Sequence, residues 1–349
     1  MTNFLVLLNH ARHAYILNNL KKKLTDQGDN VYIGSRNLDK PHLAEIVQEF
    51  GWDTFVIRPI TSRSPIGIVS YIIKQIIQIN KVIRKYKIDR IISSGPNIAS
   101  IAAKRNRINS VGWIDTENVN LQIKSAFYLS DVLIAPEFAK FNQYKRIVFK
   151  SIIDSAYLHP SIFKYNPEIV ENLRLLENGR PILYRLTNFT ALHDKKIKFR
   201  DWEYDFIREI AKNHPIILVS EGEIPKDLQK YQKKFKITDF HHILSQCKLY
   251  IGSGGSTATE ANLLGIPAIY TNPLSAGIFE EFQKRFGLLH NHRITKKLIL
   301  KSMNYFLSMK KSEINLRYKK ILNYCEDINP LLYRLATDDI EILKLEARK

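Results

Sequence analysis

The stretch LYIGSGGSTATEANLLGIPAIYTNP, residues 249–273, predicts a short strand, a glycine-rich turn, a helix and a second strand in succession. Its apolar run gives way to GSGGS at 252–256, and the helix is expected over about 257–264. Gly265 can take the positive φ that ends a helix, and Pro267 prevents the helix from continuing. A unit of this kind is the repeating element of an open parallel α/β sheet.

The same turn predicts a diphosphate site. A glycine-rich turn that leads into a helix directs unpaired backbone N–H groups and the positive end of the helix dipole at the carboxyl end of the strand. Gly254 and Gly255 would let a phosphate approach the backbone, and the hydroxyls of Ser253, Ser256 and Thr257 would add donors. The loop matches neither the GxxxxGK[ST] phosphate loop nor the GxGxxG dinucleotide fingerprint. A tight turn that binds no ligand is the alternative.

Glu260 lies one turn into the predicted helix, on the side of the loop. Its carboxylate could accept hydrogen bonds from ribose hydroxyls while the phosphates lie at the helix start. The alternative is a carboxylate that interacts only with the positive end of the helix dipole, worth ~0.3–1 kcal/mol.

Away from this segment, short apolar runs alternate with helical stripes, which is typical of parallel βαβ units. We expect strands near 4–8, 31–33, 54–57, 90–93, 110–114 and 132–135, then near 181–186, 216–219, 249–251 and 268–270. The 349 residues exceed what one core usually serves, which is ~250–300 residues. We therefore predict an α/β protein with two Rossmann-like domains at 1–155 and 179–325, a linker at 156–178 and a helical tail at 326–349.

Segment 249–273 resembles the donor-binding motif of GT-B glycosyltransferases and of UDP-N-acetylglucosamine 2-epimerases, where a glycine-rich turn binds pyrophosphate and a helix Glu binds ribose. The chain is most similar to an archaeal and bacterial family of unknown function that is placed with GT-B enzymes. This sequence departs from the family pattern at two places. The donor loop has Gly255-Ser256-Thr257-Ala258 where the family usually has a glycine-threonine-methionine run. The N-terminal loop is NHARHAY (9–15), where the family more often has a loop that contains an aspartate. Further matching segments are IDTE (114–117), LSDVLIAPE (129–137), AYLHP (156–160), YRLT (184–187) and EDINP (326–330).

The resemblance implies GT-B architecture, with two parallel sheets facing across a cleft. It implies that the C-terminal domain binds a nucleoside-diphosphate sugar and that the N-terminal domain presents the acceptor. We expect the donor to be a UDP-sugar. Arg185, Thr187 and Asn188 follow a predicted strand, where a cation could neutralise the leaving diphosphate without a metal, as GT-B enzymes do. The alternative for Arg185 is an ion pair with a carboxylate.

His10, Arg12 and His13 follow the first predicted strand, where GT-B enzymes place a base or an acceptor contact. A neutral histidine with a pKa near ~6.5 could deprotonate an acceptor hydroxyl. Helix capping or a surface position is the alternative. We take His13 as a candidate base, and His10 and Arg12 as acceptor-side residues.

Asp115 and Glu117 follow another buried strand and are the other candidate bases or acceptor contacts. Capping of the next helix is the alternative for Asp115. We expect the base to be His13, Asp115 or Glu117, opening into the cleft opposite Gly254.

His241 and His242 precede the glycine loop and could approach the nucleotide, but capping or surface roles are preferred. The sequence has no HExxH motif and no clustered Cys/His spacing, so we expect no metal and no cofactor beyond the nucleotide-sugar co-substrate.

The formal charge of +19 predicts attraction to polyanions, although a genome bias toward Lys, Ile and Asn could also produce it. A helix from Pro65 is expected to be amphipathic. Its apolar stripe consists of Ile66, Val69, Ile72, Ile73, Ile76, Ile79 and Ile83, and its polar side of Lys74, Gln75, Gln78, Lys81, Arg84 and Lys85. The stripe could pack on the sheet, or the helix could help the protein associate with an anionic membrane.

Cys247 and Cys325 make no disulfide framework, and the N-terminal apolar run reads as a strand rather than a signal peptide. No uninterrupted apolar run of ~18 residues occurs, so we expect no membrane span. The expected location is the cytoplasm, including the inner membrane face.

These patterns favour a metal-independent glycosyltransferase that acts on a cell-surface glycan or a lipid-linked acceptor of the cell envelope. A UDP-N-acetylglucosamine 2-epimerase-like isomerase, with Asp115, Glu117 and His193 among its acid/base groups, is the first alternative. A non-catalytic polyanion-binding protein is the remote one, since no specific nucleic-acid recognition motif is present.

Overall fold

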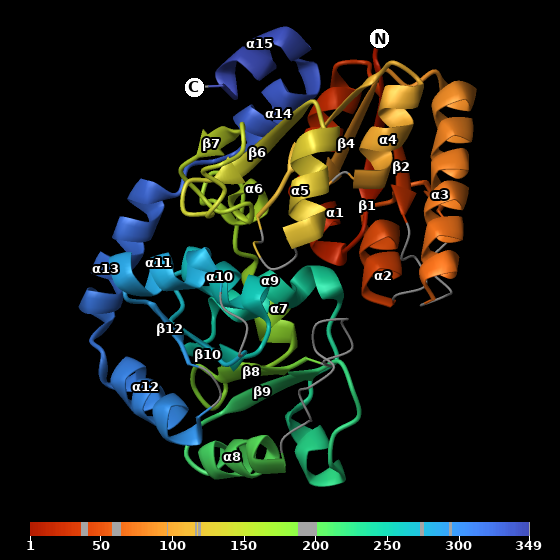
Figure 1. Cartoon of the computed structure of the whole chain (residues 1–349). Helices are drawn as coiled ribbons and strands as arrows, with labels where there is room; N and C mark the ends of the chain where they lie inside the picture. The colour runs from red at the N-terminus through yellow and green to blue at the C-terminus, as the bar shows by residue number, and fades with distance from the viewer. Residues whose placement is uncertain are drawn as a thin grey trace. The chain divides into compact units, whose positions relative to one another are not determined.

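The computed structural model describes residues 1–35, 41–57, 64–95, 97–115, 117, 120–187, 201–272, 276–292 and 295–348. The chain divides into two compact units (Figure 1). Unit 1 comprises Met1–Tyr157 and Glu326–Lys349, and unit 2 comprises Leu158–Cys325.

Unit 1 is built on a parallel sheet, seven-stranded among the described residues, with the order β3-β2-β1-β4-β5-β6-β7. Because β1 pairs with both β2 and β4, the strand order reverses there, and open α/β sheets bind ligands at the carboxyl ends of such strands. The strands are β1 Asn3–Leu8, β2 Asn30–Ser35, β3 Thr54–Val56, β4 Arg90–Ser94, β5 Asn109–Trp113, β6 Val132–Pro136 and β7 Ile147–Phe149.

Helices between these strands bury their apolar faces against the sheet. The side chains of β1 from Phe4 to Leu8 are all buried, as expected for a strand covered on both faces. The helices are α1 Ala11–Asp26, α2 Pro41–Glu49, α3 Pro65–Tyr86, α4 Asn97–Arg105, α5 Asn120–Leu129, and α6 Ser155–Leu158 at the end of the unit's first segment.

The C-terminal segment returns to unit 1 as α14 (Asn329–Thr337) and α15 (Ile340–Glu346). Arg90 Nη1 donates to the carbonyl oxygens of Leu335 and Ala336 at 3.1 and 2.7 Å. Asn329 Nδ2 donates to the carbonyl oxygen of Ala156 at 3.0 Å. The helical tail is therefore part of the first unit rather than an appendage of the second.

Unit 2 has a second parallel sheet, five-stranded in the described part, with the order β12-β11-β10-β8-β9. Its strands are β8 Ile182–Leu186, β9 Ile216–Ser220, β10 Leu249–Gly252, β11 Ala268–Tyr270 and β12 Leu289–Asn291. Its helices are α7 Pro167–Asn172, α8 Asp201–Ala211, the 3₁₀ turns η1 Lys226–Tyr231 and η2 Ile237–Asp239, α9 Phe240–Ser245, α10 Gly255–Leu263, α11 Gly277–Arg285, α12 Lys296–Ser308 and α13 Lys311–Tyr324.

Two parallel α/β sheets confirm the predicted fold class. The predicted strands all occur, and the structure adds the short edge strands β7 and β12.

The predicted division of α3 into an apolar and a polar face is wrong in part. Ile76, Ile79 and Ile83 are buried in the unit 1 core, as expected. Gln75, assigned to the polar side, is fully buried, whereas the N-terminal part of the stripe faces solvent. The N-terminal apolar residues of α3 therefore lie outside the core, and the core-facing side of the helix differs from the predicted one.

Candidate functional site

The glycine loop leads directly from the central strand β10 into α10. β10 ends at Gly252, and Gly254 is the N-cap with extended φ and ψ of −78° and 106°. Gly254 has no side chain to accept a hydrogen bond from the first helical turn. Because the first N–H groups of a helix have no partner within it, this turn can bind an anion at the carboxyl edge of the sheet.

Two of the loop glycines are also required by the packing of the protein. A Cβ at Gly255 would lie 2.7 Å from the ring Cζ of Phe279, and one at Gly252 would lie 2.6 Å from the carbonyl oxygen of Arg185. A Cβ at Gly254 would lie 3.1 Å from Tyr250 Oη. Close approach of neighbouring side chains therefore explains Gly255 without any phosphate, which the sequence interpretation did not anticipate.

Arg185 is anchored beside the start of α10 from the end of β8. Its Nη1 donates to Thr257 Oγ1 at 2.5 Å, and its Nη2 to Glu221 Oε1 at 3.0 Å. The ion pair that was the alternative for Arg185 is thus present. The Nε of Arg185 is buried and has no hydrogen-bond partner among the described residues, so the guanidinium keeps a donor for which the described protein supplies no acceptor.

Hydroxyl groups from two strand ends meet next to this guanidinium. The Oγ1 of Thr187, after β8, lies 2.6 Å from the Oγ of Ser253, after β10. Asn272 Nδ2 donates to the Ser253 carbonyl oxygen at 3.3 Å, and Tyr250 Oη donates to the Gly254 carbonyl oxygen at 3.0 Å. Burial raises the pKa of the Tyr250 phenol, so the group remains a donor at neutral pH.

Glu260 lies deeper in α10 than the sequence suggested. Its side chain is buried, and Oε1 lies 3.4 Å from Nε2 of His241 on α9. The preferred surface or capping role for His241 is therefore wrong, because this imidazole is buried against a carboxylate. His242 accepts a hydrogen bond from the Asn166 N–H at Nδ1, 3.2 Å away, and stacks on Phe163.

The expected residues Arg185, Thr187, Ser253, Gly254 and Thr257 are thus brought together at the carboxyl ends of β8 and β10. Ser256 and Gly255 belong to the same first turn, and Glu260 lies behind it. Asn188 and His193 fall outside the described residues.

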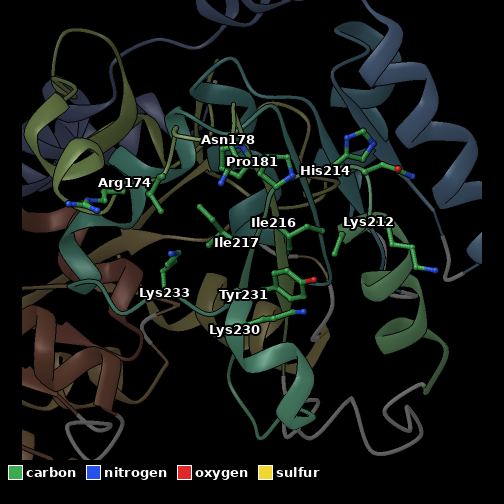
Figure 2. A pocket seen from close by; sticks show the side chains of 14 residues that line it. Arg174, Asn178, Pro181, Lys212, His214, Ile216, Ile217, Lys230, Tyr231 and Lys233 are labelled. Carbon is green, nitrogen blue, oxygen red and sulfur yellow. The ribbon is translucent and has the colours of Figure 1, made fainter.

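A basic hollow of about 440 Å³ occurs at the opposite edge of the same sheet. Its lining includes Pro181 and Pro215, which precede β8 and β9, and has no carboxylate among the described residues. Figure 2 shows its basic side chains spread around Ile216 and Ile217. The lysines are exposed to water, and Arg174 pairs with Glu177 at 3.8 Å. Because open α/β sheets bind ligands at the carboxyl edge, the loop edge remains the candidate site.

In unit 1, His10 caps α1, with Nδ1 accepting from the Arg12 N–H at 3.2 Å. His13 Nδ1 accepts from the Asn9 N–H at 3.3 Å, and its ring packs edge-on against Trp113. The neutral His13 ring then carries its proton on Nε2. This geometry suits a hydrogen-bond donor better than a general base.

Arg12 links two carboxylates at the carboxyl edge of sheet 1. Its Nε donates to Asp154 Oδ1 at 2.5 Å, and its Nη1 to Asp115 Oδ2 at 2.7 Å. Tyr157 Oη also donates to Asp154 Oδ1, at 2.6 Å. Burial alone would lower the pKa of Arg12, but the attraction of Asp154 and Asp115 outweighs it, and the pKa lies well above its ordinary value.

Asp115 is held by Arg12 through Oδ2, and no donor of the described residues reaches its Oδ1. Arg12 thus orients the Asp115 carboxylate at the carboxyl edge of sheet 1. Glu117 Oε1 accepts from the Lys140 N–H at 2.7 Å. No group of three or more His, Cys, Asp or Glu that could hold a metal ion occurs among the described residues.

The model of a family described as "Protein of unknown function (DUF354)" matches residues 3–333. No curated protein matches the chain. Solved structures match nearly its whole length at low identity, which shows the GT-B fold alone.

One structural match is the UDP-GlcNAc 2-epimerase from Neisseria meningitidis bound to UDP-GlcNAc, with a TM-score of 0.65, 12% identity, 97% of this chain covered and 100% of that chain. The UDP-GlcNAc 2-epimerase from Methanocaldococcus jannaschii matches with a TM-score of 0.65 and 15% identity over 97% and 100% of the two chains. Spinosyn rhamnosyltransferase SpnG complexed with thymidine diphosphate matches with a TM-score of 0.63 and 12% identity over 97% and 100%.

Proposed function

This chain belongs to the family described as Protein of unknown function (DUF354), and we propose that it is a glycosyltransferase whose second unit binds a nucleoside-diphosphate sugar. The donor is UDP-linked in this proposal, and the acceptor is a cell-surface glycan or a lipid-linked precursor at the cytoplasmic face of the membrane.

One observation carries the proposal: three kinds of anion-binding group converge at one edge of sheet 2. They are the uncapped start of α10, the Arg185 guanidinium and the hydroxyl pair of Thr187 and Ser253. Helix N–H groups and an arginine are a strong combination for phosphate oxygens. In support, two enzymes that share this fold were solved with UDP-GlcNAc and with thymidine diphosphate.

In the proposed reaction, an acceptor hydroxyl attacks the anomeric carbon as the bond from that carbon to the diphosphate oxygen breaks. The nucleoside diphosphate leaves, and its growing charge is stabilised by Arg185 and the α10 dipole. A metal ion is not needed for that charge in this mechanism. Asp115, oriented by Arg12, receives the proton of the acceptor hydroxyl.

A 2-epimerase is the second candidate, favoured by the structural matches to UDP-GlcNAc 2-epimerases. An epimerase would convert UDP-N-acetylglucosamine without an acceptor. A transferase would leave the sugar unchanged until an acceptor hydroxyl is supplied.

A thermal-shift screen of nucleotides and nucleotide sugars, with and without EDTA, tests the donor site. UDP or a UDP-sugar at about 100 times its Kd should raise the stability of the native state by about 2.7 kcal/mol. Arg185→Ala should lose the shift, whereas Arg208→Ala, which removes a surface arginine of α8, should keep it. No shift with any nucleotide, or one that needs a divalent ion, would contradict the proposed donor site.

With a donor in hand, the reaction is followed by NMR with added acceptor glycans. Asp115→Asn should lower kcat by ~10²–10⁴-fold while the donor Kd changes little. Conversion of UDP-N-acetylglucosamine by the protein alone would show the epimerase instead.

A further inference from the structure

The N-terminal half of α3 presents a row of large aliphatic side chains to solvent. The exposed fractions are 84% for Ile66, 57% for Val69, 52% for Ile73 and 49% for Ile77. Spacings of three and four residues place the four on one face of the helix. We call these four residues the α3 apolar face; Ser70 and Lys74 lie beside it around a shallow hollow.

This exposure is not needed to hold the helix in the fold. The opposite face of α3 buries Ile76, Ile79 and Ile83 with residues of β1 and β4, and α3 packs beside α4 (Figure 1). A contiguous apolar patch that remains exposed on a folded protein marks an interaction surface.

The same side of α3 becomes basic toward its C-terminus. Arg84 lies seven residues after Ile77, on the same face, with Lys81 beside it, and both are exposed. The helix segment 65–86 contains four basic residues and no Asp or Glu. A helix with an apolar patch and a basic flank is the kind that lies in the interface of an anionic membrane.

We infer that the α3 apolar face docks on an anionic lipid bilayer, with its aliphatic side chains among the outer acyl groups and Lys81 and Arg84 at the headgroups. By length and composition, α3 could also cross a membrane. Its buried face, however, joins the unit 1 core through Ile76 and Ile79, so the helix lies on the surface rather than spanning the bilayer.

The α3 apolar face lies near the carboxyl edge of sheet 1, the edge that carries the candidate residues of unit 1. Because α3 follows the parallel strand β3, its N-terminus is at the carboxyl edge of sheet 1, where His13 and Asp115 also follow their strands. Docking would hold that edge near the bilayer, where a lipid-linked acceptor would be found. This consequence rests on the proposed function, whereas the docking itself does not.

Charge favours lipid over a second copy of the chain. A two-fold contact through α3 would bring the basic residues of two helices together, and the helix has no carboxylate to pair with them. The chain as a whole carries a formal charge of +19, which attracts an anionic bilayer and repels another copy.

The first test is co-sedimentation with vesicles of phosphatidylcholine containing about 30% phosphatidylglycerol, against phosphatidylcholine alone. The unaltered protein should bind the anionic vesicles at least about tenfold more strongly. Val69→Gln/Ile73→Gln/Ile77→Gln should weaken that binding about tenfold or more. A matched control, Leu298→Gln/Leu316→Gln/Ile342→Gln, removes three exposed aliphatic side chains of α12, α13 and α15 and should stay within about twofold.

The second test reads insertion directly. Cys247 and Cys325 are buried, and burial raises the pKa of Cys247 to about 12, so a new surface thiol can be labelled selectively. An environment-sensitive fluorophore on Ile73→Cys should shift to the blue when anionic vesicles are added. The same label on Leu316→Cys should not respond.

The inference is overturned if the unaltered protein ignores anionic vesicles, or if the triple variant binds them as the control does. It is also overturned if light scattering shows a dimer that the α3 substitutions dissociate while vesicle binding is absent. Nucleotide thermal shifts on the same proteins separate the two proposals. Vesicle binding without a nucleotide shift would refute the donor site and leave the docking surface standing, and the reverse result would refute only the docking surface.

Discussion

Glu260 lies inside α10 with its carboxylate against His241, and its burial limits what it can offer a ligand. A buried carboxylate needs partners, because desolvation of an unpaired charge is costly. His241 supplies one at 3.4 Å. In the proposed complex, ribose hydroxyls would supply others, with His241 holding the carboxylate in position from behind.

Glu260→Ala tests this role, because a glutamine would keep an amide oxygen that can accept from the ribose hydroxyls. Loss of hydrogen bonds to a charged group should weaken nucleotide binding by ~1.5–3 kcal/mol. Calorimetry on the folded variant measures the change. Glu281→Ala, which removes a partly exposed carboxylate paired with Arg285 on α11, is the control and should bind as the unaltered protein does. Unchanged affinity in folded Glu260→Ala would leave Glu260 with a structural role only.

At this scale the sequence predicts residue types better than contacts. The loop chemistry of Ser253, Thr257 and Arg185 could be read from the position of each residue after a strand. The pairing of His241 with Glu260 could not, because α9 and α10 meet through tertiary packing that no local pattern records. For the same reason, the bridge from Arg12 to Asp115 and Asp154, over sequence separations of 103 and 142, was not foreseen.

At the scale of single elements, Gly255 in α10 has a packing role that can be tested separately from ligand binding. A Cβ at Gly255 meets the Phe279 ring, which is itself stacked on Tyr270. Gly255→Ala should therefore lower the free energy of unfolding by about 1–3 kcal/mol through overpacking. Urea denaturation measures it.

A double-mutant cycle provides the control, because Gly255→Ala and Phe279→Leu share one contact. The double variant should be more stable than the sum of the two single changes implies. Strict additivity would mean that the Phe279 ring is not what excludes a side chain at position 255.

Secondary-structure prediction succeeded where a segment had a clear apolar run. It was wrong in part where apolar residues occur on more than one face of a helix, as in α3. The strands of both sheets are buried apolar runs and could be located. The strands β7 and β12 were not predicted, although β3 and β11 are equally short and were located by their apolar runs. β12 is Leu-His-Asn, with one apolar residue, and β7 is an isolated apolar run between Arg146 and Lys150. In α3 aliphatic residues such as Ile68 and Ile77 also occur outside the predicted stripe, so the 3.6-residue period could not decide which aliphatic side chains reach the core and which remain exposed.

At the scale of the whole molecule, the sequence indicated two domains but not the return of the chain. Arg90 is bound to the carbonyl oxygens of α14 across a separation of more than two hundred residues. From the sequence of the tail at 326–349, an apolar helix face can be predicted. The unit against which that face packs cannot, because local sequence does not specify a tertiary partner. The assignment of α14 and α15 to unit 1 is therefore a product of tertiary packing.

Stability toward acid is expected to depend on His290 in β12. Burial, with added repulsion from His292 and Arg317, lowers the pKa of His290 from about 6.5 to about 4. Its Nδ1 lies 2.6 Å from Ser302 Oγ on α12, and its ring stacks on Tyr305. The folded protein therefore holds this imidazole neutral at pH values where the unfolded chain would protonate it.

Proton linkage gives the direction in which the free energy of unfolding changes with pH. Because the folded pKa is below the unfolded one, the contribution of His290 is complete above about pH 6.5 and is lost progressively as the pH falls toward 4. Urea denaturation between pH 7 and 5 should show this loss, in a window where most carboxylates are still ionised. His290→Gln cannot titrate and should reduce the slope, while His214, His242 and His292, whose pKa values are also lowered by burial, still contribute to it. His159→Gln, at a side chain that pairs with nearby Ser161, should keep the slope of the unaltered protein. An equal slope in His290→Gln and the unaltered protein would show that other groups carry the acid sensitivity.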